Sequence, residues 1–193
     1  MTKLYEEGFN PGDLKTKVSE MLVATADSSD QEIDSSVSEA LRALRQRLQM
    51  DVVFVSEFVD GQRVFRFVDT AGETPLISAG HSEPLEQTWC QLVVDERIPQ
   101  FIPDATRYSG EIKLPALGFE VGTFLSTPIL LGGGQIYGTL CCFSFSHNEQ
   151  IQQTDLKYLK SAATMIARRI DTTEVVPPRG ASPTKTKLNL PSR

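Results

Sequence analysis

The chain has 193 residues, a formal net charge of -6 and 40% hydrophobic residues. That length suits one hydrophobic core and is short for two domains, and the acidic balance argues against a protein whose main task is to bind nucleic acid. No run approaches the roughly 18 consecutive apolar residues of a membrane span, and the acidic first residues are unlike a signal peptide, so we expect a cytoplasmic protein with no membrane partner.

The chain opens with a weakly patterned arm and continues with a clear helix. Residues 1–32 hold only a short amphipathic patch before a polar run, so we expect an N-terminal arm with at most a short helix. After this arm, apolar residues recur at helical spacing, which predicts a helix over residues 33–49. Its apolar stripe consists of Ile33, Val37, Ala40, Leu41, Leu44 and Leu48.

The segment DVVFVSEFVDGQRVFRFVD, residues 51–69, predicts a β-hairpin that reverses at Asp60-Gly61, a dipeptide typical of a type I′ turn. Counting outward from the turn gives the expected cross-strand pairs: Phe54 with Phe67 and Ser56 with Phe65 on one side, Glu57 with Val64 and Val55 with Arg66 on the other. Glu57 and Arg66 are then diagonal neighbours within reach of each other. They form either a structural ion pair or polar contacts of a pocket.

The middle third predicts a second helix, a short edge strand and an irregular loop. Leu85, Trp89 and Leu92 recur at helical spacing behind Pro84, which suits a first helical position. This helix carries Trp89 and Cys90. The run FIPDATRY then predicts an edge strand broken by its proline, and residues 109–120 are most typical of a lid or lining loop.

Residues 121–145, VGTFLSTPILLGGGQIYGTLCCFSF, predict two long apolar strands joined across a triple-glycine turn. The glycines are followed by no Lys-Ser/Thr pair and no helix, so a turn is favoured over a phosphate-binding loop. Together with the first hairpin, these strands predict one antiparallel sheet covered by helices, which is an α+β fold.

A closing helix is predicted over residues 154–171, with Thr154 as its cap. Its apolar residues form a wide arc, in which Tyr158, Ala162 and Met165 make a second stripe beside the main one. Such a helix has two surfaces to cover. The second surface is buried either inside the monomer or in a homodimer, paired there with the helix over residues 33–49.

The C-terminal residues 172–193 carry four basic side chains against one acid, a local charge of +3, together with four prolines. They cannot build a core, so we expect a disordered tail. It is either a solubilising end or a docking segment for an acidic partner.

The three cysteines are Cys90, Cys141 and Cys142. An odd number without a CxxC spacing favours neither a disulfide scaffold nor a structural zinc site. Cys141 and Cys142 are consecutive on a predicted strand and therefore point to opposite faces, so only one of them can share a pocket with Cys90. A thiol redox site needs two such sulfurs, while buried thiols in a core strand are commonly mere packing.

Four stretches together resemble a GAF domain over residues 33–171. They are DVVFVSEFVDGQRVFRFVD, TWCQLVVDERIPQFIPDA, STPILL followed by IYGTLCCFS, and TDLKYLKSAATMIARRI. They are most similar to bacterial GAF modules found alone or fused to cyclic-di-GMP enzymes and sensor kinases. The resemblance implies a GAF-like (profilin/PAS-like) sheet of five or six antiparallel strands, with terminal helices on one face and a small-molecule pocket on the other.

The resemblance leaves the ligand and any cofactor unknown. The Asn-Lys-Phe-Asp-Glu signature of cyclic-nucleotide-binding GAF domains is not recognisable, and no cysteine is followed by the histidine usual in bilin-binding relatives. One GAF family reduces free methionine sulfoxide with pocket cysteines. The cysteine positions do not match the pattern of that family convincingly.

The sequence therefore predicts a cytoplasmic, non-catalytic GAF-type regulatory domain, expected to form a homodimer and to bind a small molecule or a signalling protein. The expected ligand contacts are Glu57, Arg66, Trp89, Cys90 and Ser126. We expect no catalytic residues and no metal site. Two alternatives stay open: a protein-interaction module without a ligand, and a thiol-based enzyme similar to free methionine sulfoxide reductase.

Overall fold

The computed structural model describes residues 30–72 and 77–174. Almost all of the expected C-terminal tail and of the expected N-terminal arm lie outside the described residues. Residues 172–174, which were predicted to belong to the tail, continue the closing helix instead. Among the described helices, none is both long enough and apolar enough to cross a membrane.

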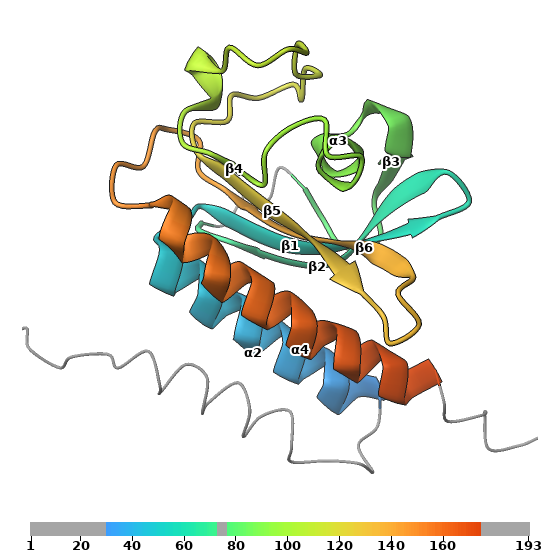
Figure 1. Cartoon of the computed structure of the whole chain (residues 1–193). Helices are drawn as coiled ribbons and strands as arrows, with labels where there is room; N and C mark the ends of the chain where they lie inside the picture. The colour runs from blue at the N-terminus through green and yellow to red at the C-terminus, as the bar shows by residue number, and fades with distance from the viewer. Residues whose placement is uncertain (1–29, 73–76, 175–193) are drawn as a thin grey trace, which may run out of the picture.

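Six antiparallel strands form one sheet in the order β3-β2-β1-β6-β5-β4 (Figure 1). Their bounds are Val52–Val59 for β1, Gln62–Thr70 for β2, Ser82–Pro84 for β3, Phe101–Ile102 for β4, Phe124–Leu130 for β5 and Ile136–Phe143 for β6. The predicted α+β fold with five or six antiparallel strands is confirmed, and β4 is the edge strand that the sequence predicted.

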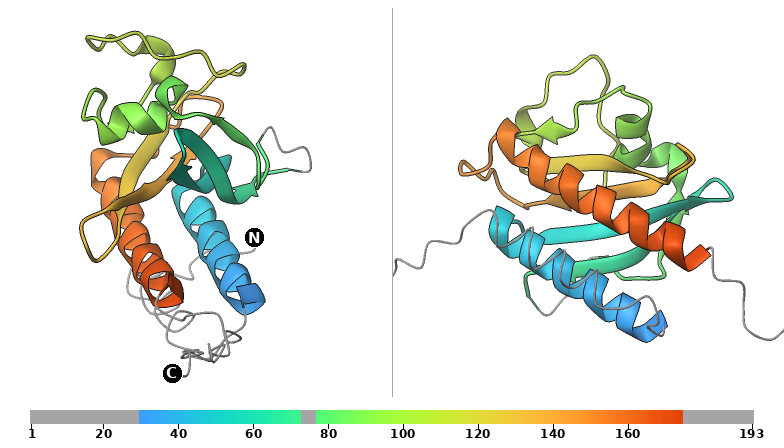
Figure 2. Two further views of the ribbon diagram at one scale, coloured as in Figure 1. Left: turned by 90° about the vertical axis from the view of Figure 1, so that its right-hand side faces the viewer. Right: turned by 60° about the horizontal axis from the view of Figure 1, so that its bottom comes forward.

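The helices lie on the two faces of this sheet. The long helices α2 (Asp30–Leu48) and α4 (Leu156–Glu174) cover one face, whereas the short helix α3 (Trp89–Val94) and the surrounding loops cover the other (Figures 1 and 2). The described residues also include three 3-10 turns: η1 at Leu85–Gln87, η2 at Ala105–Arg107 and η3 at Gln153–Asp155. The terminal helices thus share one face, as the resemblance implied.

The sheet separates two hydrophobic cores, because successive side chains on a strand point to opposite faces. The helix-side core lies under α2 and α4 and includes Val53, Val55, Leu125, Ile129, Leu140 and Cys142 from the sheet. The α3-side core lies under α3 and includes Phe54, Phe65, Phe124, Cys141 and Phe143 from the sheet. Strands β5 and β6 therefore contribute alternate residues to both cores.

The first hairpin has the predicted turn but not the whole predicted register. Asp60 and Gly61 have φ values of 51° and 72°, as a type I′ turn requires, and the pairs of Ser56 and Glu57 are the predicted ones. The register shifts at Val55, which pairs with Phe67 instead of Arg66, while Phe54 pairs with Val68 instead of Phe67. One extra residue on β2, a β-bulge, produces this shift, and Phe67 consequently packs against the helix-side core.

Two predicted helix starts are wrong. Pro84 ends β3, and α3 begins only at Trp89, where the Thr88 side chain accepts a hydrogen bond from the backbone N–H of Gln91. Thr154 lies inside the 3-10 turn η3 and does not cap α4; at this turn the backbone N–H of Gln152 donates to Asp155 Oδ2 at 2.9 Å. In both places a 3-10 turn precedes the helix, which a 3.6-residue pattern cannot indicate.

Candidate functional site

The most unusual buried side chain is Arg63 on β2, which the sequence analysis did not single out. Its side chain is 7% exposed. Nη1 donates to Cys90 Sγ at 3.1 Å, and Nη2 lies 2.8 Å from Glu83 Oε1. The guanidinium carbon lies over the rings of Phe65 and Phe54, 4.6 Å and 5.5 Å from their centroids. Burying a guanidinium requires such partners, because an unpaired buried charge is strongly destabilising.

Cys90 stands in the first turn of α3 and meets a strand cysteine across the α3-side core. Its sulfur lies 3.4 Å from Cys141 Sγ, and both residues are fully buried. Cys142 lies in the helix-side core instead. The structure thus confirms that the two consecutive cysteines point to opposite faces and that only one of them can meet Cys90.

Hydroxyl groups continue this contact along the sheet. Ser126 Oγ lies 2.9 Å from Cys141 Sγ, which also donates to Thr139 Oγ1 at 3.2 Å. Thr139 Oγ1 in turn lies 2.9 Å from Ser56 Oγ. We call this set the buried polar chain. It consists of Glu83, Arg63, Cys90, Cys141, Ser126, Thr139 and Ser56.

The buried polar chain shifts the pKa values of its two thiols in opposite directions. Burial alone would raise the pKa of Cys90, but the hydrogen bond with Cys141, the charge of Arg63 and the bonds from Thr139 and Arg63 outweigh it and lower that pKa to about 6. Burial raises the pKa of Cys141, and its hydrogen bond and charge interaction with Cys90 raise it further. Burial opposes the charge of Arg63, but the Cys90 and Glu83 charges hold the pKa of Arg63 above its usual value. Cys90 is therefore the thiolate of the pair near neutral pH.

Three of the five expected ligand contacts come together on the α3 side. Cys90 and Ser126 both contact Cys141, as described above, and both are fully buried. Trp89 is also buried; its ring meets Phe124 edge-on, and its Nε1 donates to the carbonyl of Pro115 at 2.8 Å. That bond ties α3 to the loop over residues 109–120.

The other two expected contacts lie on the opposite face. Glu57 is two residues beyond Val55, which belongs to the helix-side core, so its side chain points to the helix side as well. Glu57 and Arg66 form an ion pair, and their side chains are 24% and 44% exposed. The structure therefore pairs these two residues but does not bring them to Trp89, Cys90 or Ser126.

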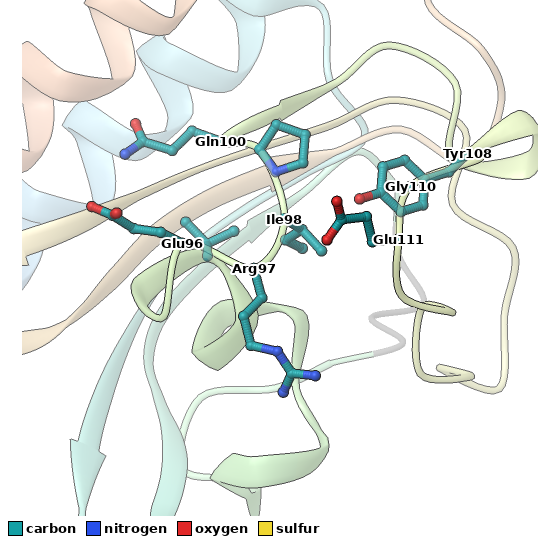
Figure 3. A pocket seen from close by; sticks show the side chains of 9 residues that line it. Glu96, Arg97, Ile98, Gln100, Tyr108, Gly110 and Glu111 are labelled. Atoms are coloured by element: carbon teal, nitrogen blue, oxygen red, sulfur yellow. The ribbon is translucent and has the colours of Figure 1, made fainter.

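An open pocket of about 550 Å³ lies beside the end of α3, on the face away from α2 and α4 (Figure 3). Its lining residues are Val93, Glu96, Arg97, Ile98, Pro99, Gln100, Tyr108, Gly110 and Glu111. Val93 and Ile98 belong to the α3-side core, so the pocket reaches that core directly. Its rim carries both charges and a phenol, which suits a small polar molecule.

The loop over residues 109–120 borders this pocket and contains no helix or strand. Its apolar side chains nevertheless pack against the α3-side core, among them Ile112, Leu114, Leu117 and Phe119. Within residues 30–72 and 77–174 there is no group of three or more His, Cys, Asp or Glu side chains that could hold a metal ion.

The family model for the GAF domain matches residues 30–171. The chain belongs to the GAF domain family. Among curated proteins none matches this chain. The family match covers nearly all of the residues that the structure describes, and its boundaries lie close to those that the resemblance gave.

Several solved structures share this fold at low sequence identity. The GAF domain of an Acinetobacter phosphoenolpyruvate-protein phosphotransferase has a TM-score of 0.67 and 16% identity, with 88% of this chain and 96% of that chain covered. A phycoerythrobilin-bound GAF domain from a cyanobacterial phytochrome has a TM-score of 0.66 and 12% identity, with 90% and 98% covered. Free methionine-R-sulfoxide reductase from Neisseria meningitidis has a TM-score of 0.62 and 17% identity, again with 90% and 98% covered. At these identities the likeness shows the fold alone.

Proposed function

We propose that this GAF domain is a non-catalytic sensing domain of a signalling system, and that a small polar molecule binds in the open pocket at the end of α3. The observation that carries the proposal is the position of Val93 and Ile98, which line the pocket and also belong to the α3-side core. A molecule in this pocket therefore contacts side chains of the hydrophobic core. The three free buried cysteines favour a reducing, cytoplasmic setting.

The route from this pocket to the terminal helices runs through β5 and β6. Phe124 and Cys141 pack on the α3 side, while their neighbours Leu125 and Cys142 pack under α2 and α4. A shift of either strand therefore displaces side chains in both cores, because close-packed interiors transmit displacement. We propose that occupancy of the pocket changes the packing of α2 and α4 in this way.

The output surface in this proposal is the outer side of α2 and α4, used in a homodimer or with a signalling partner. The second apolar stripe of α4 supports it. Tyr158, Ala162 and Met165 are only half-buried within the chain. Arg47 lies over the Tyr158 ring at 5.2 Å, so both helices meet at this stripe. A second chain would cover the part that remains exposed.

Thermal unfolding with the small-molecule fraction of a bacterial extract tests the pocket. A ligand that binds only the folded chain raises the midpoint, by several degrees when it is present well above its Kd. Glu111 lines the pocket and Glu120 does not, and both are exposed, so E111Q and E120Q are matched variants. We expect the extract to stabilise the wild type and E120Q but not E111Q. No stabilisation of the wild type, or equal stabilisation of E111Q, contradicts the proposal.

A thiol reductase is the second candidate, because Cys90 and Cys141 approach each other beside Arg63 and one structural relative is a methionine sulfoxide reductase. Burial argues against it. Both sulfurs are fully buried, so a substrate of amino-acid size does not reach them without opening of the core. With free methionine sulfoxide and dithiothreitol we expect no methionine above the rate of a C90A variant; production that depends on Cys90 would replace the sensing proposal.

A further inference from the structure

Cys90 and Cys141 lie close enough to react with each other, and this reaction needs no ligand in the pocket. The two sulfurs come from different elements, α3 and β6, and lie 3.4 Å apart in the reduced state. A disulfide bond is about 2.05 Å long, so the sulfurs have to approach by only about 1.4 Å. The short helix α3, which carries Cys90, follows the 3-10 turn η1 and is joined to β4 by a loop.

We propose that Cys90 and Cys141 form an oxidation site for hydroperoxides, in which Cys90 reacts first and Cys141 then closes a reversible disulfide. This function goes beyond the proposed ligand sensing and does not depend on the open pocket. It makes the α3 side of the domain responsive to oxidants.

The reaction balances with hydrogen peroxide as the oxidant. The Cys90 thiolate sulfur bonds to one peroxide oxygen and the O–O bond breaks, so the sulfur becomes a sulfenic acid and the hydroxide released takes up the proton that Cys90 had lost. The Cys141 sulfur then attacks the Cys90 sulfur. The S–S bond forms, the S–O bond breaks, and the hydroxide leaves as water with the Cys141 proton. In sum, two thiols and one peroxide give one disulfide and two waters.

Arg63 determines the order of the two steps. Its Nη1 contacts Cys90 Sγ at 3.1 Å and favours a thiolate there, which is the nucleophilic form. The pKa values agree, since that of Cys90 is lowered to about 6 while that of Cys141 is raised. Cys141 therefore stays a thiol until Cys90 has been oxidised.

Arg63 also marks the side from which a small oxidant reaches the pair. Its partner Glu83 lies on the edge strand β3 and has a side chain that is 31% exposed. The buried polar chain thus runs from solvent at Glu83 through Arg63 to Cys90. We expect hydrogen peroxide, which is close to water in size and polarity, to enter from this edge, whereas a larger substrate is excluded by the burial of both sulfurs.

Cys142 is the internal control for this proposal. It is as fully buried as Cys141 but lies on the opposite face of β6, in the helix-side core. Burial raises its pKa, so it is a poor nucleophile as well. If burial alone controlled oxidation, Cys141 and Cys142 would behave alike. The proposed site instead predicts that Cys141 enters the disulfide and Cys142 does not.

The experiment treats the reduced full chain with hydrogen peroxide at pH 7, blocks the remaining thiols with a maleimide in denaturant, and determines the intact mass and the linked peptides. We expect one maleimide-blocked thiol instead of three and a disulfide link between Cys90 and Cys141. Reduction with dithiothreitol before blocking should restore three blocked thiols. C142A should link as the wild type does. C141S keeps a hydroxyl for Ser126 and Thr139 and should give no disulfide, and R63K should react at least tenfold more slowly.

Three blocked thiols after treatment of the wild type would overturn the proposal. So would a link that includes Cys142, or a link between two chains on a non-reducing gel. The wild-type mapping alone decides this even where a variant folds poorly. The pocket variant E111Q should form the link at the wild-type rate, so a failure of the oxidation site is distinguishable from a failure of ligand sensing.

Discussion

Two arginines on β2 have opposite environments although only two residues separate them. Arg63 is enclosed between Cys90, Glu83 and two aromatic rings, whereas Arg66 forms a half-exposed ion pair with Glu57. Buried charges depend on every partner, while exposed ion pairs contribute little because water solvates both ions. The two arginines thus provide a matched pair of variants.

Replacing Arg63 by Ala should lower the free energy of unfolding by about 3 kcal/mol, since a buried charge pair and the packing against Phe65 are both lost. Replacing Arg66 by Ala should lower it by roughly 0–1 kcal/mol. Urea denaturation of both variants measures the two values. Equal losses would show that the Arg63 contacts add nothing beyond an ordinary surface pair.

The acidity of Cys90 makes stability depend on pH. Its pKa is lowered from 9.0 to about 6 on folding, so between these values the unfolded chain binds the proton that the folded chain has released. The free energy of unfolding therefore rises with pH over this window, at up to about 1.4 kcal/mol per pH unit, and the contribution is lost as pH falls through about 6. Urea titrations at pH 6 and pH 8 should show this rise in the wild type, and C90A should lack most of it.

The residue scale also shows what the sequence could and could not predict about the site. The alternation of a strand correctly separated Cys141 from Cys142, because that inference needs only two consecutive residues. Arg63 was missed although it stands two residues from Phe65 on the same strand, a spacing that places both on one face. Its role depends on Glu83 and Cys90, which no local pattern connects to it.

At the scale of elements, the start of α3 holds the buried polar chain in place. Thr88 is fully buried; its Oγ1 accepts from the backbone N–H of Gln91 at 3.2 Å and donates to the carbonyl of Leu85 at 2.7 Å. A helix of only six residues has few backbone hydrogen bonds of its own, so this cap contributes a large share of its stability.

Replacing Thr88 by Ala should therefore loosen α3 and lower the free energy of unfolding by about 1 kcal/mol, while T88S should retain most of it. The measurement is the rate at which a thiol reagent modifies Cys90 in the folded chain. We expect a several-fold faster reaction in T88A and a near wild-type rate in T88S. An unchanged rate in T88A would mean that opening of α3 does not control access to Cys90.

Two glycines of the second hairpin have contrasting surroundings. A Cβ at Gly138 on β6 would meet the backbone of Ser56 on β1, whereas a Cβ at Gly133 in the turn would meet nothing within 4 Å. G138A should lower the free energy of unfolding by about 1–3 kcal/mol, because backbone on a central strand cannot yield, and G133A should change it little. Thermal denaturation compares the two. A neutral G138A would contradict the close approach of β1 and β6.

Element positions were predictable from the sequence where periodicity and turn chemistry agree. The Asp60-Gly61 turn, the strands around the three glycines and the two long helices all follow from such patterns. The β-bulge on β2 was not predictable from the sequence. One inserted residue leaves the alternation intact on either side of the bulge and only changes which face of the sheet each side chain takes beyond it. The corrected register moves Phe67 to the helix side.

At the scale of the whole molecule, one sheet joins two cores of different character. The helix-side core is apolar, whereas the α3-side core contains the buried polar chain and opens to the pocket at Val93 and Ile98. Family resemblance in the sequence predicted this division of faces correctly. It could not predict the ligand, because one fold can hold many different binding sites and most of the residues that line this pocket lie in loops.

The native mass spectrum of the gently purified chain tests the sensing account most directly. The account expects a discrete non-covalent mass of small-molecule size on the wild-type chain and on E120Q, absent from E111Q, with the bound species present as a dimer. Bare chains in all three samples, both as purified and after incubation with a small-molecule extract, would contradict ligand sensing and leave a protein-interaction module.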